Sequence, residues 1–228
     1  MLKINRRVYL KLTNKCNRQC SFCYYKNDPK AFGDMAFGTL ENIIRNELSI
    51  HPDNKYMRVI LTGGEPTLHP ELGQFLEYLN RIPIIRVVLE TNGTNVEDPV
   101  FIRVLNYFKH KHFLKISLYS ELLKADAEYC SKLTEFIDFA QQTGIRYVLN
   151  ARYVDETDKV WLENFIAEHN LSSSFGELQL LPIYDCNLYR DNTLPHYDFS
   201  FVTYEYDGHT LLWHQTDNES QNVEVIHE

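Results

Sequence analysis

The chain has 228 residues and a formal net charge of −8, and 44% of its residues are hydrophobic. This length suits one domain with at most a small appendage, and the hydrophobic share is enough for a buried core. The acidic balance and the lack of a long lysine or arginine run argue against a nucleic-acid-binding protein. No stretch approaches about 18 consecutive apolar residues, so no segment is expected to span a membrane.

The first residues of the chain and the placement of its cysteines bear on the cellular compartment in which the protein is expected. Residues 1–7 lack the apolar core of a secretory signal. Three of the five cysteines are crowded between residues 16 and 23, which is not the pattern of a disulfide framework. We therefore expect a protein of the reducing cytoplasm.

Strand-like and helix-like patterns alternate along the chain. Apolar alternation predicts strands at residues 7–12, 57–61, 84–89, 113–118, 146–154 and 177–181. Helical spacing lies between them, with start or stop signals at Thr39, Pro70, Asp98-Pro99 and Gly144. Such alternation is typical of an α/β fold with parallel strands. Six β/α units are fewer than a closed eight-fold barrel has, so we predict a partial (β/α)6 barrel.

The last part of the chain has a different pattern. Strand-like residues 199–206 and 209–214 flank Asp207-Gly208, a strong signal for a two-residue hairpin. We expect this hairpin to cover the open edge of the barrel or one of its mouths, and residues 216–228 to fray. The predicted domains are the partial barrel, residues 1–185, and a C-terminal extension with the hairpin, residues 186–228.

Cys16, Cys20 and Cys23 follow the first predicted strand at the spacing C-x3-C-x2-C. Three thiolates are one too few for a closed zinc site or a four-thiolate cluster. The simplest interpretation is an iron–sulfur cluster with one iron left open for a non-protein ligand. A zinc site completed by Cys130, Cys186 or a distant histidine, and chance spacing, are the alternatives.

A second motif, Leu61-Thr62-Gly63-Gly64-Glu65-Pro66, follows the second predicted strand. Together with the cysteine triplet it resembles the radical S-adenosylmethionine (AdoMet) superfamily, over about residues 7–184. The resemblance implies a partial barrel whose catalytic centre is a 4Fe–4S cluster on Cys16, Cys20 and Cys23. With Thr91-Asn92-Gly93, the motifs look most like the branch of peptide-modifying maturases and the molybdenum-cofactor cyclase.

The resemblance also implies a set of residues that bind AdoMet. They are Phe22, Gly63, Gly64, Glu65, Pro66, Thr91, Asn92, Ser117, Arg152 and Leu181. Most of them follow a predicted strand, at the edge of a parallel sheet where ligands gather. Glu65 could pair with the AdoMet ammonium or fix its own loop, and Arg152 could bind the AdoMet carboxylate or form a surface ion pair. Tyr119 departs from the family, where many relatives have aspartate.

The implied activity is reductive cleavage of AdoMet, whose 5′-deoxyadenosyl radical takes hydrogen from a peptide or small-molecule substrate. An external flavodoxin-like or ferredoxin-like donor would supply the electron, and the cluster would be oxygen-sensitive. Family members often carry auxiliary clusters after the barrel, but Cys186 is the one cysteine there, so none is expected. The alternatives are an activase that acts on a partner glycyl-radical enzyme, and a non-catalytic iron–sulfur carrier or sensor.

Overall fold

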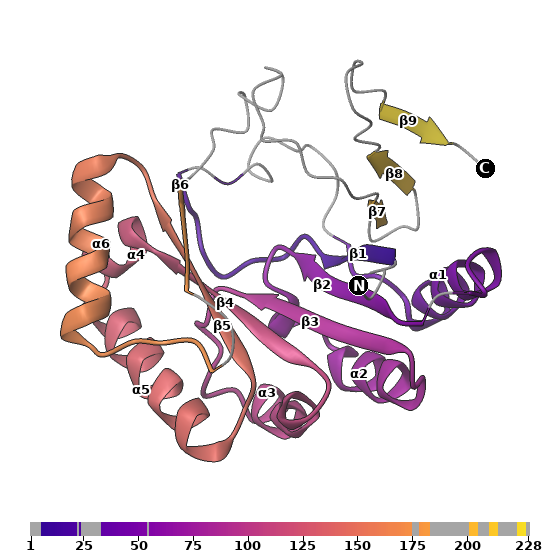
Figure 1. The fold of residues 1–228 in the computed structure, drawn as a ribbon, viewed down its shortest axis with the longest axis horizontal. Coiled ribbons are helices and arrows are strands. Elements are labelled where there is room, and N and C mark those ends of the chain that lie inside the picture. Colours follow the sequence, from indigo (N-terminus) through magenta and orange to yellow (C-terminus); the bar gives the residue numbers. More distant parts are fainter. Residues whose placement is uncertain are drawn as a thin grey trace. The chain divides into compact units, whose positions relative to one another are not determined.

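The computed structural model describes residues 6–21, 23, 33–53, 55–174, 178–182, 201–204, 210–213 and 223–226. The chain forms two compact units. The first consists of Met1–Cys16, Lys30–Leu89 and Thr193–Glu228, and the second of Asn17–Pro29 and Glu90–Asn192. In each unit, parallel strands are followed by helices (Figure 1).

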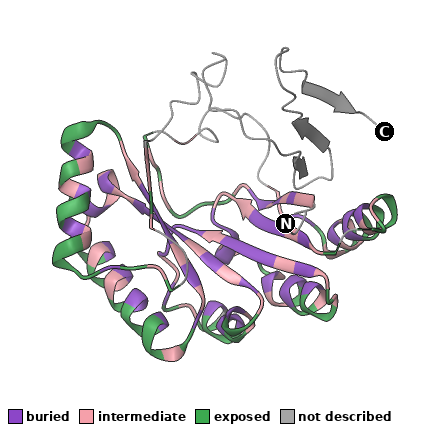
Figure 2. Ribbon diagram, in the orientation of Figure 1, coloured by how far each residue is buried: buried purple, intermediate pink, exposed green. Residues whose placement is uncertain are grey.

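The first unit is built on parallel strands in the order β3-β2-β1. They are β1 (Arg6–Thr13), β2 (Met57–Gly63) and β3 (Ile85–Thr91), whose last two residues belong to the second unit. Between them lie α1 (Phe37–Ile50), the 3-10 helix η2 (Pro66–Leu68) and α2 (Leu72–Arg81). Buried apolar residues lie along the strands and along one face of each helix (Figure 2). The alternation of the first strand, with Val8, Leu10 and Leu12 fully buried, is confirmed.

Three further strands extend the sheet of the first unit beyond β1. Strand β7 (Phe201–Tyr204) pairs in parallel with β1, and β8 (Thr210–Trp213) and β9 (Val223–Ile226) continue the sheet in antiparallel order. The expected hairpin strands are confirmed and cover an edge of β1; the turn residues Asp207-Gly208 lie outside the described part. The expectation that all of residues 216–228 would fray is wrong, because the strand-forming sequence Val-Glu-Val-Ile pairs with the edge of β8.

The second unit is built on parallel strands in the order β6-β5-β4. They are β4 (Phe113–Tyr119), β5 (Tyr147–Tyr153) and β6 (Gln179–Pro182). Its helices are α3 (Pro99–Val104), η3 (Leu105–Lys109), α4 (Ser120–Ala125), α5 (Ala127–Thr143) and α6 (Glu156–Glu168). Asp98 accepts from the backbone of Phe101 at the start of α3, and left-handed Gly144 ends α5, both as expected.

The α/β class is therefore confirmed, with β1, β2 and β3 parallel in the first unit and β4, β5 and β6 parallel in the second. Two local expectations were wrong. Thr39 is not an N-cap, because α1 begins at Phe37 and the Thr39 amide donates to the carbonyl of Ala36. Helix α4 was not anticipated, since its six residues are too short for a periodic signal. The start of the sixth predicted strand, Glu177, lies outside the described residues.

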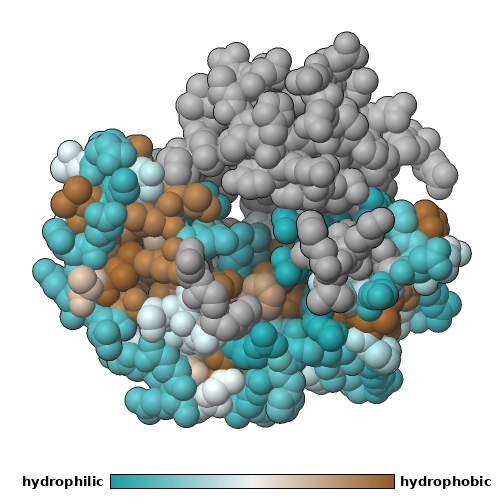
Figure 3. All heavy atoms as spheres, viewed as in Figure 1, coloured by the Kyte–Doolittle hydropathy of each residue, from teal (hydrophilic) through white to brown (hydrophobic). Residues whose placement is uncertain are grey.

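The surface of the described residues is mostly hydrophilic on the outer sides of α5 and α6, and hydrophobic side chains gather beside α6 (Figure 3). Val154 and Val160 are among the apolar side chains that are more than half exposed. In the part of the chain that the structure describes, no helix combines the length and hydropathy needed to cross a membrane.

Asp158 holds the ends of β4 and β5 to the start of α6. Its carboxylate accepts from Ser120 Oγ and Lys124 Nζ, both at 2.5 Å, and from the Val154 amide at 2.7 Å. Because the side chain is buried, Asp158→Ala should lower the free energy of unfolding by about 2–4 kcal/mol, measured by urea denaturation. The control is Glu156→Gln, an exposed partner of Lys159 on the same helix, which should change stability little. Equal stability of both variants would contradict this role.

His69 should make the stability of the first unit depend on pH. Its Nδ1 accepts from the Glu71 amide at 3.1 Å, so Nε2 carries the proton and donates to the Met35 carbonyl at 3.1 Å. Burial lowers the pKa of His69 although Asp34 favours the charged ring. His69 therefore takes up the proton that charges its ring more readily in the unfolded chain than in the folded protein. The stabilisation should be complete above about pH 6.5 and should be lost as the pH falls towards the lowered pKa. Denaturant unfolding across this range checks it, and an equally steep pH dependence in His69→Gln would contradict it.

Candidate functional site

None of the three cysteines of the predicted cluster motif forms a disulfide. Cys16 is exposed, and Cys20 and Cys23 are half-buried. The Cys23 amide donates to the Cys20 carbonyl at 3.2 Å, which makes a tight turn between them. Among the described residues, no three cysteine, histidine or acidic side chains converge as a ready metal site. Three accessible thiols fit the donor set of a cluster with one open iron; Phe22 lies outside the described residues.

The residues before Cys16 are fixed within the first unit. Thr13 Oγ1 donates to Asp34 Oδ1 at 2.7 Å, and Lys15 Nζ pairs with Asp34 Oδ2 at 2.6 Å. The Asn14 side chain accepts from the Gly33 amide at 2.8 Å. Polar residues at the end of β1 and just after it therefore tie the chain before Cys16 to Gly33 and Asp34.

Gly63 and Gly64 pack against the same stretch. The Gly64 amide donates to the Thr13 carbonyl at 2.7 Å, and the Glu65 amide donates to the Lys15 carbonyl at 2.8 Å. A Cβ atom on Gly64 would lie 2.1 Å from the Lys15 oxygen, and one on Gly63 would lie 2.2 Å from the Thr13 oxygen. The two glycines are therefore required by the backbone that leads to Cys16, whether or not a ligand also approaches them.

Glu65 is almost fully buried, with 1% of its surface exposed. Its Oε1 accepts from the backbone amide and the hydroxyl of Thr67, at 3.1 and 2.7 Å. It therefore caps η2, and Pro66 occupies the first position of that short helix. Of the two roles expected for Glu65, fixing its own loop is the one that these contacts display.

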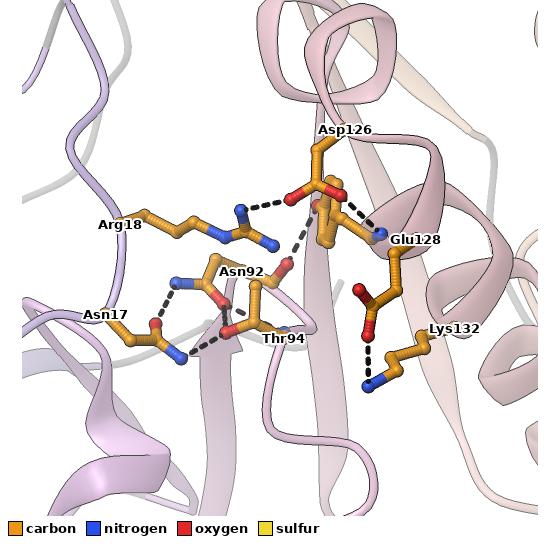
Figure 4. Close-up of polar contacts among 8 residues, drawn as sticks. Asn17, Arg18, Asn92, Thr94, Asp126, Glu128 and Lys132 are labelled. Carbon is orange, nitrogen blue, oxygen red and sulfur yellow. Dashed lines mark hydrogen bonds and ion pairs between the residues drawn. The ribbon is translucent and has the colours of Figure 1, made fainter.

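Thr91-Asn92-Gly93 ends β3 and begins the second unit's connection to α3. The Gly93 amide donates to Thr91 Oγ1 at 3.1 Å, and Gly93 has a φ of 72°. A Cβ atom there would lie 2.5 Å from a methyl carbon of Leu133, so glycine lets the turn pack on α5. The side chain of Asn92 is hydrogen-bonded to the cysteine loop, because its Nδ2 donates to Asn17 Oδ1 at 3.2 Å (Figure 4).

Ser117, Arg152 and Leu181 come together on one face of β4, β5 and β6. Strand register aligns Ser117 with Asn150 and Gln179, and Tyr119 with Arg152 and Leu181. Paired residues of parallel strands share a face. With its amide oxygen turned towards Arg152, Asn150 accepts from Nε and Nη2 at 3.3 and 3.2 Å. Burial raises the pKa of Tyr119, although a hydrogen bond with Ser117 opposes this, so the phenol stays protonated and can donate.

A small cavity of about 280 Å³ lies beyond the ends of β4 and β5. It is lined by Ser120, Glu121, Lys124, Val154, Asp155, Thr157 and Asp158, most of which have polar side chains. Ser21, between Cys20 and Cys23, donates to Glu121 Oε2 at 2.6 Å, so the wall of this cavity contacts the cysteine loop. The volume is below the usual range for ligand pockets, and we assign no substrate to it.

Sequence reasoning missed a set of residues that contact the cysteine loop from far along the chain. Arg18 pairs with Asp126, 108 positions later, and lies over the ring of Tyr129. The one available signal was Asp126 itself, an acidic residue directly before a helical pattern, which is typical of an N-cap. Cys130, which was considered as a further ligand of a zinc site, is half-buried.

Comparison with known proteins shows what the chain is similar to. The family model of the radical SAM superfamily matches residues 10–120, which contain the cysteine triplet, Gly63–Pro66 and Ser117. The subtilosin biosynthesis protein AlbA of Bacillus subtilis is 29% identical over 107 residues, covering 47% of this chain and 22% of that protein. The GTP 3′,8-cyclase of Clostridium perfringens strain 13 is 25% identical over 182 residues, covering 76% of this chain and 55% of that protein.

The chain thus spans less than two thirds of the length of these relatives. The matched region contains both motifs in the expected order, each directly after a parallel strand. The family match and these relatives support the radical SAM superfamily as the family of the chain.

Proposed function

We propose that this chain is an enzyme that cleaves AdoMet reductively at a 4Fe–4S cluster held by Cys16, Cys20 and Cys23. The observation that carries the proposal is the C-x3-C-x2-C spacing of three cysteines that form no disulfide and are at least partly exposed. Their approach is fixed by hydrogen bonds from the Gly-Gly-Glu segment to Thr13 and Lys15. The family match supports the same chemistry.

When bound, the cluster and AdoMet would supply a 5′-deoxyadenosyl radical that takes a hydrogen atom from the substrate. The residues of the chain would hold and orient these groups. The backbone of Gly63 and Gly64 and the short helix capped by Glu65 would border the methionine part of AdoMet. We assign the other AdoMet contacts to Phe22, Pro66, Thr91, Ser117, Arg152 and Leu181. Among them, Arg152 carries a fixed positive charge on the β5 face and suits a carboxylate.

The substrate class is proposed from the relatives. AlbA is named for the biosynthesis of a bacteriocin, and the cyclase is named for the nucleotide GTP. A peptide or a small molecule therefore suits this chain, with an external flavodoxin-like or ferredoxin-like electron donor. A cytoplasmic location and the division into a catalytic part, residues 1–185, and an extension, residues 186–228, belong to the same proposal.

The test is an anaerobic assay of AdoMet cleavage. The protein is reconstituted with iron and sulfide, reduced with dithionite and mixed with AdoMet, and 5′-deoxyadenosine is measured by chromatography. We expect a product that requires iron, sulfide and reductant together. A fully loaded cluster that yields no 5′-deoxyadenosine, with or without candidate peptides and nucleotides, would contradict the proposal and favour a cluster carrier or sensor. Hydrogen abstraction that needs a second protein would instead favour the activase alternative.

A further inference from the structure

The first residues of the cysteine loop are held by a closed circuit of contacts within the second unit (Figure 4). We call this circuit the loop clamp and define it by Asn17, Arg18, Asn92, Asp126 and Tyr129. Two of its members lie between the first and second cysteines of the motif, and the others come from the end of β3 and from the start of α5.

On one side of the clamp, Arg18 forms an ion pair with Asp126 and stacks on the ring of Tyr129. Arg18 Nη1 donates to Asp126 Oδ2 at 2.9 Å, and the guanidinium carbon lies 4.5 Å from the centre of the Tyr129 ring. The other oxygen of Asp126 accepts from the Tyr129 amide at 2.9 Å and caps α5. This hydrogen bond and Arg18 lower the pKa of Asp126, so its carboxylate stays charged at neutral pH.

The Asn17 side of the clamp returns to the end of β3. Asn17 Nδ2 donates to Thr94 Oγ1 at 2.7 Å, and Asn17 Oδ1 accepts from Asn92 at 3.2 Å. Asn92 Oδ1 accepts from the amide and the hydroxyl of Thr94, at 2.9 and 2.5 Å. The Tyr129 hydroxyl donates to the Asn92 carbonyl at 2.9 Å and closes the circuit.

These contacts are all made by groups of the chain itself. The side chain of Asn92 is 9% exposed, and both of its polar atoms are engaged by the loop and by its own turn. A ligand loop that is ordered beforehand loses less conformational entropy when it binds. Groups that orient metal ligands from behind typically change metal affinity or activity when they are removed.

We propose that Arg18 and Asn92 are positioning residues that order the cysteine loop before the cluster binds, and that Asn92 acts on the loop rather than on AdoMet. The part about the cluster rests on the proposed function; the ordering of the loop does not. Arg18 supplies a planar donor that both pairs and stacks, which lysine reproduces only in part.

The test compares Arg18→Gln and Asn92→Ala with Lys132→Gln. Lys132 lies on α5, the helix that Asp126 caps, and makes surface ion pairs with Glu128 and Glu97, outside the circuit. In the metal-free full chain, hydrogen exchange of the amides at 17–21 should accelerate at least several-fold in the first two variants, with the thermal midpoint above the assay temperature. The control should exchange at the wild-type rate, and Arg18→Lys should restore part of the protection.

The reconstituted proteins give a second readout. Cluster loss to a chelator, followed by absorbance, should be about 10–100-fold faster in Arg18→Gln and Asn92→Ala, while AdoMet affinity of the protein that retains its cluster should match the wild type. Unchanged exchange in both folded variants would overturn the clamp. If Asn92→Ala bound AdoMet more weakly but retained its cluster as well as the wild type, the assignment of Asn92 to the loop rather than to AdoMet would be overturned. Failure of the wild type to bind a cluster would contradict the proposed function, while the exchange experiment would still decide whether the loop is ordered.

Discussion

Cys20→Ala should reduce 5′-deoxyadenosine formation to the background of an assay without protein. The alanine side chain provides no thiolate, and two protein ligands cannot retain a cluster that already depends on three. Because removing groups that only orient ligands costs about 10–100-fold, we expect losing a ligand to cost more than about 100-fold. The measurement combines product chromatography with iron and sulfide content per chain.

The matched control for this variant is Cys130→Ala. Cys130 lies on α5, its thiol is free, and partial burial raises its pKa, so it is a less reactive thiol outside the motif. We expect Cys130→Ala to keep the wild-type iron content and product yield. A loss in Cys130→Ala equal to that in Cys20→Ala would refute the assignment of the cluster to the motif and would revive a metal site that includes Cys130.

Gly64→Ala should destabilise the first unit. Its new methyl group would lie 2.1 Å from the Lys15 carbonyl oxygen, a backbone atom that cannot rotate away. The segment before Cys16 would have to separate from Gly64 and Glu65, which breaks or stretches hydrogen bonds of 2.7 and 2.8 Å. We expect a loss of about 2–4 kcal/mol in the free energy of unfolding, measured by denaturant titration, together with weaker cluster retention.

Gly38→Ala is the control for Gly64→Ala, because the same substitution is expected not to destabilise the protein there. Gly38 lies in the first turn of α1, and a Cβ atom there would meet nothing within 4 Å. Alanine in a helix is favoured over glycine by about 0.5–1 kcal/mol, so this variant should be as stable as the wild type or more stable. If Gly64→Ala were equally well tolerated, the close backbone approach at Lys15 would not exist in solution.

The fold class could be predicted because the sequence pattern reports local geometry. The alternating apolar residues of β1 and the helical spacing of the apolar residues of α2 predicted the correct element types. Asp98 and Gly144 marked the start of α3 and the end of α5. The errors were local. Thr39 is a residue type that often caps helices, but here it lies inside the first turn of α1. Helix α4 has only six residues and therefore shows no repeating pattern.

The sequence by itself determined which residues are candidates for the proposed chemistry. Three cysteines at C-x3-C-x2-C spacing and a Gly-Gly-Glu-Pro segment are visible without any structure, because spacing within one loop is a property of the chain. The same holds for the strand ends that carry them, since side-chain period distinguishes strands from helices.

Only the tertiary structure decided what holds these residues in place. Arg18 and Asp126 are 108 positions apart, and Asn17 and Asn92 are 75 apart, so no local pattern relates them. The role of Gly64 likewise depends on the carbonyl of Lys15, which comes from another strand end. A sequence lists hydrogen-bonding groups, but their partners are chosen by packing of distant elements, where each buried polar group must find a donor or acceptor.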